Sequence, residues 1–198
     1  MRIIAGAYKG KRLVTPRGKV TRPTADQVRI ALMDTLMPWL PGARLLDLYA
    51  GAGGVGLEAL SRGAAHATFV ERDARAVAAL RENVAALGVA PAARVVRDDV
   101  VRAIASLRRE GERFGLVFLD PPYDTDLTAA TLDALGDGVL LADGALVVAQ
   151  HLTKLAPAGV AGVLAAFRTR RFGETTLTFF RAGGYDAQST TKPEPPAV

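Results

Sequence analysis

The sequence contains no cysteine and only two histidines in 198 residues. Without cysteine, the chain has no disulfide framework, no thiol nucleophile and no thiolate metal site. His66 and His151 lie far apart and show no metal-ligand spacing, so we expect no bound metal. Met1 to Ile4 is too short an apolar run for a signal peptide, and no apolar stretch is long and charge-free enough to span a bilayer. We therefore expect a cytoplasmic protein without a membrane partner.

Acidic residues are scarce at the start of the chain, which makes the charge distribution uneven. Asp26 is the only acid among residues 1–29, which hold eight basic residues and carry a charge of +7. The whole chain carries +5, so residues 30–198 sum to −2. A basic segment beside a nearly neutral domain indicates a polyanionic partner, although a solubilising arm is the common alternative. The basic residues are Arg2, Lys9, Lys11, Arg12, Arg17, Lys19, Arg22 and Arg29.

The basic segment has the composition of an ordered hairpin. Two apolar pairs, Ile3-Ile4 and Leu13-Val14, flank a stretch that contains Tyr8 and two glycines. This pattern predicts two short strands within residues 2–15 that turn at Lys9-Gly10 and present a basic face.

The rest of the chain alternates between strand-like and helix-like segments. We predict an α/β fold with a mostly parallel sheet of seven strands, an antiparallel last strand, and helices on both faces. A content of 49% hydrophobic and 23% charged residues fits one such domain with short extensions. The predicted strands are residues 45–50, 67–71, 94–97, 114–119, 144–149, 167–172 and 175–181. The predicted helices are residues 28–39, 73–88, 100–109 and 127–135, and a further helix follows the glycine-rich turn and ends near Gly63.

The sequence Asp120-Pro121-Pro122-Tyr123 directly follows the strand predicted at Phe114 to Leu119. Open α/β sheets bind their ligands at the carboxyl ends of the strands. The Asp120 carboxylate and the carbonyl of Pro121 or Pro122 could accept both protons of an exocyclic amine, while Tyr123 could stack on the ring that carries it. For these four residues alone, a strand that simply ends in a Pro-Pro turn explains the sequence equally well.

A glycine-rich turn follows the first predicted strand. Gly51, Gly53 and Gly56 satisfy G-x-G-x-x-G, the pattern of nucleotide-binding loops. Glu71 ends the next strand, 20 residues after Gly51, where an acid that binds a ribose is expected. Glycines alone would indicate only a tight turn, but with a strand before and an acid after them they predict a nucleotide-like ligand. Both NAD and S-adenosylmethionine carry an adenosine ribose.

Two further positions favour S-adenosylmethionine. Asp47 lies four residues before Gly51, where a carboxylate suits an ammonium and a sulfonium better than a pyrophosphate. Together with Asp-Pro-Pro-Tyr, it resembles the Rossmann-like amino-methyltransferases, which methylate exocyclic amines of adenine, cytosine or guanine, or a glutamine amide. In that class a polar residue after the third strand commonly meets the adenine amine, which implies Asp98 or Asp99 here. Asp99 could equally cap the helix that follows, and each residue could take one of the two roles.

The combination of arm, glycine loop and Asp-Pro-Pro-Tyr resembles a narrower family. The narrower family consists of the bacterial 16S ribosomal RNA guanine-N2 methyltransferases, which modify a small-subunit loop near the P site. The resemblance spans residues 2 to about 181, and the Arg-Pro-Thr segment is its most specific part. Ile30 and Asp34 depart from the family pattern, as does Ala52, where a serine is frequent. The matching segments are residues 2–6, 10–13, 22–29, 46–51, 56–64, 70–71 and 116–123.

The resemblance implies a function and a set of site residues. It implies a methyl transfer from S-adenosylmethionine to the N2 amine of a guanine in 16S ribosomal RNA, within a small ribosomal subunit or an assembly intermediate, by a monomeric enzyme. It divides the chain into an RNA-binding arm of residues 1–22, a methyltransferase domain of residues 23–183 and a disordered tail of residues 184–198. The implied residues are Asp120, Pro121, Pro122 and Tyr123 for catalysis; Asp47, Tyr49, Gly51, Gly53, Gly56, Glu71, Asp98 and Asp99 for the cofactor; and Arg2, Lys9, Lys11, Arg12, Arg22 and Arg29 for RNA.

Three other functions remain open from the sequence. A DNA adenine-N6 or protein-glutamine methyltransferase would use the same chemistry, but the chain has no room for a large target-recognition domain. An NAD-dependent oxidoreductase would share the glycine loop, but no catalytic constellation of His, Lys and Tyr is evident. A non-catalytic RNA-binding assembly factor would have no need of an intact Asp47, Gly51, Glu71 and Asp120.

Overall fold

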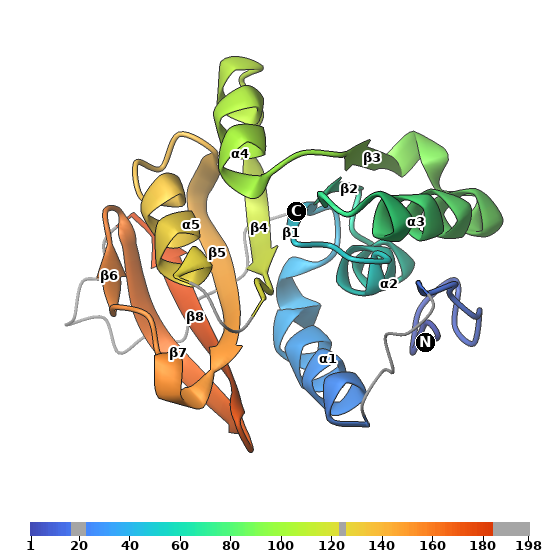
Figure 1. The fold of residues 1–198 in the computed structure, drawn as a ribbon, viewed down its shortest axis with the longest axis horizontal. Coiled ribbons are helices and arrows are strands. Elements are labelled where there is room, and N and C mark those ends of the chain that lie inside the picture. The colour runs from blue at the N-terminus through green and yellow to red at the C-terminus, as the bar shows by residue number, and fades with distance from the viewer. Residues whose placement is uncertain (17–22, 123–125, 184–198) are drawn as a thin grey trace.

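The computed structural model describes residues 1–16, 23–122 and 126–183. In these residues the strands form one sheet of eight, in the order β3-β2-β1-β4-β5-β8-β7-β6 (Figure 1). The first five strands of that order run parallel, and β8, β7 and β6 continue the sheet with antiparallel pairing. The strands are β1 (Arg44–Leu48), β2 (His66–Val70), β3 (Ala93–Val96), β4 (Phe114–Leu119), β5 (Leu141–Leu152), β6 (Val160–Ala161), β7 (Leu164–Phe172) and β8 (Thr175–Ala182).

Helices cover both faces of the sheet, as predicted. On one face α1, α2 and α3 share a hydrophobic core with residues of β1, β2, β4, β5 and β8, and on the other α4 and α5 share a core with residues of β1, β4 and β5. The α-helices are α1 (Pro23–Leu36), α2 (Gly54–Ser61), α3 (Ala74–Leu87), α4 (Val100–Arg109) and α5 (Leu127–Leu135), with 3-10 turns η1 (Met37–Trp39), η2 (Ala90–Ala92) and η3 (Thr153–Leu155).

The predicted element boundaries are correct where local signals are strong. The strand at Phe114–Leu119 and the helix at Leu127–Leu135 have the predicted limits. Asp73 caps α3 by accepting hydrogen bonds from the amides of Arg75 and Ala76, and Gly88 ends it in a left-handed conformation.

The predicted strand count is wrong by one. The additional strand, β6, has two residues and pairs only with β7 at the sheet edge. So short a strand has no period of its own in the sequence, and its pairing depends on where β7 lies. The strand β5 is also longer than predicted, since it extends on both sides of residues 144–149.

The arm differs from the predicted hairpin of two strands. Arg2 and Arg12 form a single antiparallel bridge, and residues 5–10 form bends and turns between them. Ile3 and Leu13 are buried in the same core as α1, α2 and α3, so the arm packs as part of the domain. Arg22 and the predicted tail, residues 184–198, lie outside the described residues.

Two kinds of feature are absent from the described part of the chain. None of the helices in residues 1–16, 23–122 and 126–183 is both long and apolar enough to cross a membrane. In the same residues, no three side chains of His, Cys, Asp and Glu are grouped so that they could hold a metal ion.

Candidate active site

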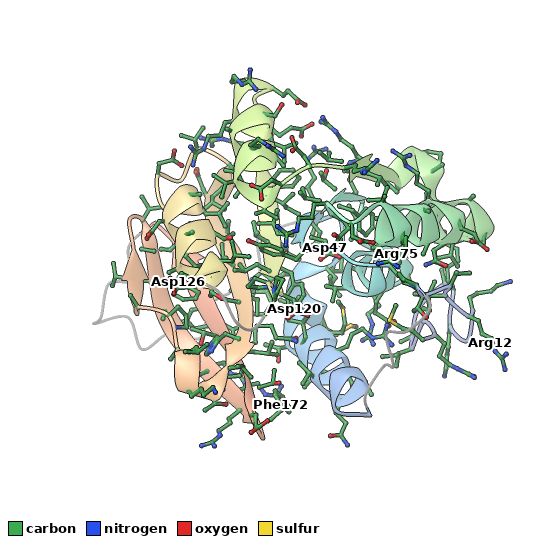
Figure 2. All side chains as sticks on the ribbon, in the orientation of Figure 1. Arg12, Asp47, Arg75, Asp120, Asp126 and Phe172 are labelled. Carbon is green, nitrogen blue, oxygen red and sulfur yellow. The ribbon has the colours of Figure 1, made fainter. Side chains whose placement is uncertain are left out.

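The parallel strands deliver the predicted polar residues to one edge of the sheet. A cavity of about 860 Å³ lies there, and we call it the main cavity. Its volume is within the range of small-molecule sites. Figure 2 marks two acids near the centre of the molecule, with Asp47 among the last two residues of β1 and Asp120 directly after β4. The predicted catalytic and cofactor-binding residues that line the main cavity are Asp47, Tyr49, Gly51, Glu71, Asp98, Asp99, Asp120, Pro121 and Pro122.

Asp47 combines burial with the proximity of two other acids. Its side chain is 1% exposed, and its Oδ2 accepts a hydrogen bond of 2.9 Å from the amide of Gly56 in the first turn of α2. The pKa of Asp47 is raised to about 7, chiefly by burial and to a smaller extent by the charges of Asp120 and Glu71, while the hydrogen bond from Gly56 lowers it. A cation bound in the cavity would favour the ionised carboxylate.

Glu71 shapes the glycine loop from the end of β2. Its Oε2 accepts a hydrogen bond of 2.9 Å from the amide of Gly51, and its Oε1 accepts one of 2.8 Å from the amide of Asp73. Each carboxylate oxygen has a second lone pair that could accept a hydroxyl proton from a ligand. Glu71 therefore also has a structural role that its spacing from the glycines did not reveal.

The glycines of the loop differ in what they do. Gly51 has φ of 56° and lines the main cavity. Gly53 has φ of 86°, and a Cβ there would meet Leu80. A Cβ on Gly56 would lie 2.3 Å from the ring of Phe69, so this glycine serves the close packing of α2 on β2. Gly53 and Gly56 thus lie behind the wall of the main cavity and do not line it.

Tyr49 lies between the first strand and the glycine loop. Its φ is 63°, a backbone conformation that residues other than glycine seldom adopt. Its hydroxyl lies 2.7 Å from Oγ1 of Thr131 on α5, and burial raises its pKa. Tyr49 lines the main cavity while its hydroxyl is held by the opposite helix layer. Such strain is often found where a site is pre-organised.

Asp98 and Asp99 make different hydrogen bonds, and one of the two, Asp99, caps the helix that follows. Asp99 caps α4 by accepting a hydrogen bond of 3.0 Å from the amide of Val101. Asp98 accepts from the amide of Asp99 and from Nε of Arg102, and these bonds lower its pKa. Both residues line the main cavity.

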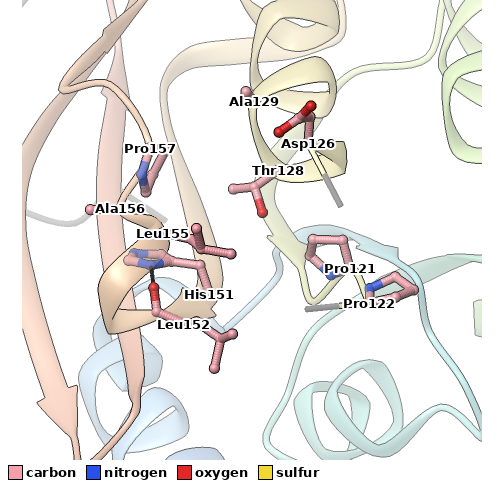
Figure 3. A pocket seen from close by; sticks show the side chains of 10 residues that line it. All are labelled: Pro121, Pro122, Asp126, Thr128, Ala129, His151, Leu152, Leu155, Ala156 and Pro157. Atoms are coloured by element: carbon pink, nitrogen blue, oxygen red, sulfur yellow. Dashed lines mark hydrogen bonds between the residues drawn. The ribbon is translucent and has the colours of Figure 1, made fainter. Parts of the chain in front are cut away.

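The Asp-Pro-Pro sequence separates the main cavity from a second one of about 460 Å³, which we call the side cavity. Pro121 and Pro122 line both, and Tyr123 lies outside the described residues. In Figure 3, Asp126 and Thr128 at the start of α5 face His151 and Leu155 across the side cavity. The imidazole of His151 is engaged inside the protein, with Nδ1 2.8 Å from the carbonyl of Leu152 and Nε2 2.8 Å from Oγ1 of Thr178.

The predicted RNA-binding residues fall into two groups. Arg2, Lys9, Lys11 and Arg12 are exposed, and Arg12 lies at the outer edge of the arm (Figure 2). Arg29 is only 6% exposed, lines the main cavity, and donates from Nη2 to the carbonyl of Arg2 over 2.9 Å. Helical periodicity could not show this, because the arm covers the face of α1 that Arg29 occupies.

Asn83 connects the arm to the glycine loop, and sequence reasoning missed it. Its carboxamide accepts from the amide of Val14 over 2.7 Å and donates to the carbonyls of Val14 and Ala52, each over 3.0 Å. It is 1% exposed. A side-chain amide on the apolar side of a helix, as at the position of Asn83 in α3, is the one pattern that could have drawn attention to it.

Glu58 holds the other side of the arm. It is fully buried, accepts from the amides of Ile4 and Ala5 over 2.7 and 3.0 Å, and forms an ion pair with Arg62. Met1, Thr15 and Pro16 line the main cavity. The basic arm is thus one wall of the same cavity that the carboxylates line.

Comparison with known proteins gives consistent matches over most of the chain. The family model described as "Conserved hypothetical protein 95" matches residues 1–181. The "Putative rRNA methyltransferase YlbH" of Bacillus subtilis is 35% identical over 184 residues, which cover 93% of this chain and 100% of that protein. The "Ribosomal RNA small subunit methyltransferase D" of Escherichia coli is 41% identical over 150 residues, or 76% of this chain and 74% of that one.

A solved structure has the same fold. The "Putative methyltransferase yhhF from Escherichia coli" superposes with a TM-score of 0.81 at 35% identity, over 92% of this chain and 97% of that one.

Proposed function

The chain belongs to the Conserved hypothetical protein 95 family, with rRNA methyltransferases among its relatives, and we propose that it methylates the N2 amine of a guanine in 16S ribosomal RNA. Its relatives and its fold identify it as an rRNA methyltransferase with a Rossmann-like fold that uses S-adenosylmethionine as cofactor.

The observation that carries the proposal is the convergence of three carboxylates on a cavity that shares its Pro-Pro wall with a second cavity. Asp47, Glu71 and Asp120 come from three parallel strands, and the charges of the other two raise the pKa of Asp47. This set of acceptors fits a ligand that carries an ammonium, a sulfonium and a ribose. We assign the ammonium to the neighbourhood of Asp47, the ribose to Glu71, and the adenine to Asp98 or Asp99.

We assign the target base to the side cavity. It is lined by Pro121 and Pro122, and because proline has no amide hydrogen, these residues offer only acceptors from their backbone. A base that leaves its stack could enter there with its amine directed at Asp120. In the proposal Tyr123 stacks on this base.

The chain's own residues would act mainly by positioning and by charge. When bound, S-adenosylmethionine supplies an electrophilic methyl group on a sulfonium sulfur. Asp120 and a proline carbonyl accept hydrogen bonds from the amine, fix its approach and stabilise the positive charge that develops on nitrogen. As the N–C bond forms and the methyl–sulfur bond breaks, the bond's electron pair would stay on sulfur as a neutral thioether, and the amine would lose one proton to Asp120, directly or through water.

The exposed cations of the arm would hold the RNA. Arg2, Lys9, Lys11 and Arg12 lie on the surface of the segment that also walls the main cavity. Contacts between such cations and phosphates would make the affinity for RNA depend on salt.

The test is transfer of a labelled methyl group from S-adenosylmethionine to small ribosomal subunits that lack the modification, followed by digestion to nucleosides. We expect the label in N2-methylguanosine. Label in N6-methyladenosine would replace guanine by adenine as the target. Tight cofactor binding without labelled RNA would direct the same assay to DNA and protein amines.

A further inference from the structure

A second group of arginines lies at the end of β7, away from the basic arm. Arg168, Arg170 and Arg171 occupy the last five residues of this strand. Both β7 and β5 are antiparallel to β8, so β7 runs in the same direction as β5 and β4. Its carboxyl end therefore lies at the same sheet edge as Asp120. Figure 2 shows Phe172 at the end of β7, where the chain turns into β8.

These arginines are not neutralised by neighbouring acids. Arg168 and Arg171 are exposed, and within the described part of the chain no carboxylate lies within 4.0 Å of either guanidinium. Residues 164–182 contain four arginines and one glutamate, a charge of +3, although residues 30–198 as a whole sum to −2. The net charge of the longer segment hides this local excess.

Ring and backbone contacts hold the guanidinium groups in place. Arg168 lies 5.9 Å from the ring centre of Phe179, and Nε of Arg171 donates to the carbonyl of Gly173 over 3.0 Å. Arg170 instead has a structural role, since it donates to the carbonyl of Ala31 and to Thr35 on α1. A guanidinium that is already positioned loses less side-chain freedom when it binds a phosphate.

The turn of the β7–β8 hairpin contacts the segment that lines the side cavity. Leu152 and Leu155 line that cavity, and Thr153 between them bonds to the turn of the β7–β8 hairpin. The amide of Thr153 donates to the carbonyl of Glu174 over 2.7 Å, and its hydroxyl donates to the carbonyl of Gly173 over 3.2 Å. From β4 to β7 the sheet crosses three strand spacings, or roughly 14 Å.

We propose that Arg168 and Arg171 bind phosphates of the RNA that flanks the target nucleotide, on the side of the active site opposite the basic arm. The inference rests on the proposed function, because RNA is the polyanion that a base in the side cavity would bring to this surface. The arm and the hairpin would then hold the RNA on both sides of Asp120. Guanidinium groups suit this task because their donors match phosphate oxygens in pairs.

The test compares the double variant Arg168→Gln/Arg171→Gln with the unchanged protein. Binding to protein-free 16S ribosomal RNA is measured at several salt concentrations, and methyl transfer is measured with unmodified small subunits. Affinity for RNA falls as salt rises, and each phosphate contact contributes about 0.7 to the steepness of log affinity against log salt for single-stranded RNA. We therefore expect the loss of two contacts to make this dependence shallower by about 1.4. We also expect KM for subunits to rise roughly tenfold, with kcat and cofactor affinity unchanged.

Two further variants separate this surface from general effects of charge and folding. Arg109→Gln/Arg113→Gln removes the same charge at the opposite sheet edge, where both residues are exposed, and should leave the slope unchanged. Arg168→Lys/Arg171→Lys keeps the charge and should retain most of the slope.

Three results would overturn the inference. They are an unchanged slope and KM in the glutamine variant, an equal loss in the control variant, and a loss with subunits but not with protein-free RNA, which would indicate a ribosomal protein as the partner. Failure of the proposed function itself would show separately, as absence of methyl transfer by the unchanged protein. The salt dependence of RNA binding would still decide the role of the arginines.

Discussion

Single residues in the main cavity show how burial and charge prepare it for a cationic ligand. Asp47 is buried beside α2, and its raised pKa reflects a carboxylate that has lost its water and has other acids as neighbours. Asp120 and Glu71 add negative charge at the neighbouring strand ends. The positive end of α2 and the Gly56 amide offset only part of this cost.

The first prediction concerns the pH dependence caused by Asp47. Because a cation favours the ionised form, affinity for S-adenosylmethionine should fall as the pH is lowered through about 7, by up to about tenfold per pH unit. Calorimetric titrations between about pH 5.5 and 8.5 measure this. The variant Asp47→Asn should bind weakly at every pH, and a wild-type affinity that is flat across this range would contradict the assignment.

The second prediction concerns the stability of the protein without ligand, which the ionisation of Asp47 should lower at high pH. Its pKa is higher in the folded protein than in the unfolded chain, so its contribution to stability is present at acid pH and is lost as the pH rises to about 7. Without ligand, Asp47→Asn should therefore raise the free energy of unfolding at about pH 8 by about 1 kcal/mol or more, a Tm increase of about 2–4 °C. At about pH 4 the Tm values should converge.

A third prediction concerns Asp120. Replacing it with asparagine keeps the size of the side chain but removes the charge and the proton acceptor. We expect kcat to fall by about 10²-fold or more, with the cofactor dissociation constant changed only a few-fold. Single-turnover methyl transfer and a binding titration test both parts, and turnover at the wild-type rate would reject the role of Asp120.

Whole elements meet at the arm, which is tied to α2 by Glu58 and Ser61 and to α3 by Asn83. Ser61 Oγ accepts from the amide of Tyr8 and donates to the carbonyl of Ala5, so backbone groups of the arm are paired without a regular strand. Asn83 also bonds to the carbonyl of Ala52 in the glycine loop. The arm and the loop therefore share one buried side chain.

The fourth prediction tests this shared side chain. Asn83→Ala leaves the amide and carbonyl of Val14 and the carbonyl of Ala52 without their partner, which should cost about 1–3 kcal/mol of stability. We also expect weaker S-adenosylmethionine binding, because the loop loses a support. Glu82→Ala, at the exposed neighbouring position, is the matched control. A fall in Tm with unchanged cofactor affinity would mean that Asn83 supports the arm alone.

Across the whole molecule, the sheet edge has the acidic main cavity at its centre and basic surfaces at both sides. The arm is attached to α2 and α3 on one side, and the β7–β8 hairpin extends the sheet on the other (Figure 1). Such an arrangement would attract an RNA while keeping a cationic cofactor near the carboxylates.

The fifth prediction belongs to this scale. Neutralising Lys9, Lys11 and Arg12 together should make the salt dependence of RNA binding shallower. The slope of log affinity against log salt should become less negative by about 2, because three phosphate contacts are lost. Cofactor affinity should change by no more than about threefold, because these side chains are exposed and the arm residues that line the main cavity are Met1, Thr15 and Pro16. An equal loss of cofactor and RNA binding would instead indicate that the arm is needed for folding.

Local sequence accounts for the order of the elements and for the residues at the strand ends. Apolar runs of strand length, the caps Asp73, Gly88 and Asp99, and the glycine loop are local signals, because their physical causes act within a few residues. Parallel strands have their carboxyl ends at one shared edge, so the strand pattern alone predicts that Asp47, Glu71 and Asp120 lie together.

Long-range packing accounts for the contacts that complete the site. It placed Arg29 inside the cavity wall, joined Asn83 to both the arm and the glycine loop, added β6, and brought Arg168 and Arg171 to the edge that carries Asp120. The bonds from Arg29 to Arg2 and from Val14 to Asn83 span 27 and 69 positions, and no local pattern encodes such pairings. They depend on how helices and strands pack against one another, which is established only in the folded chain.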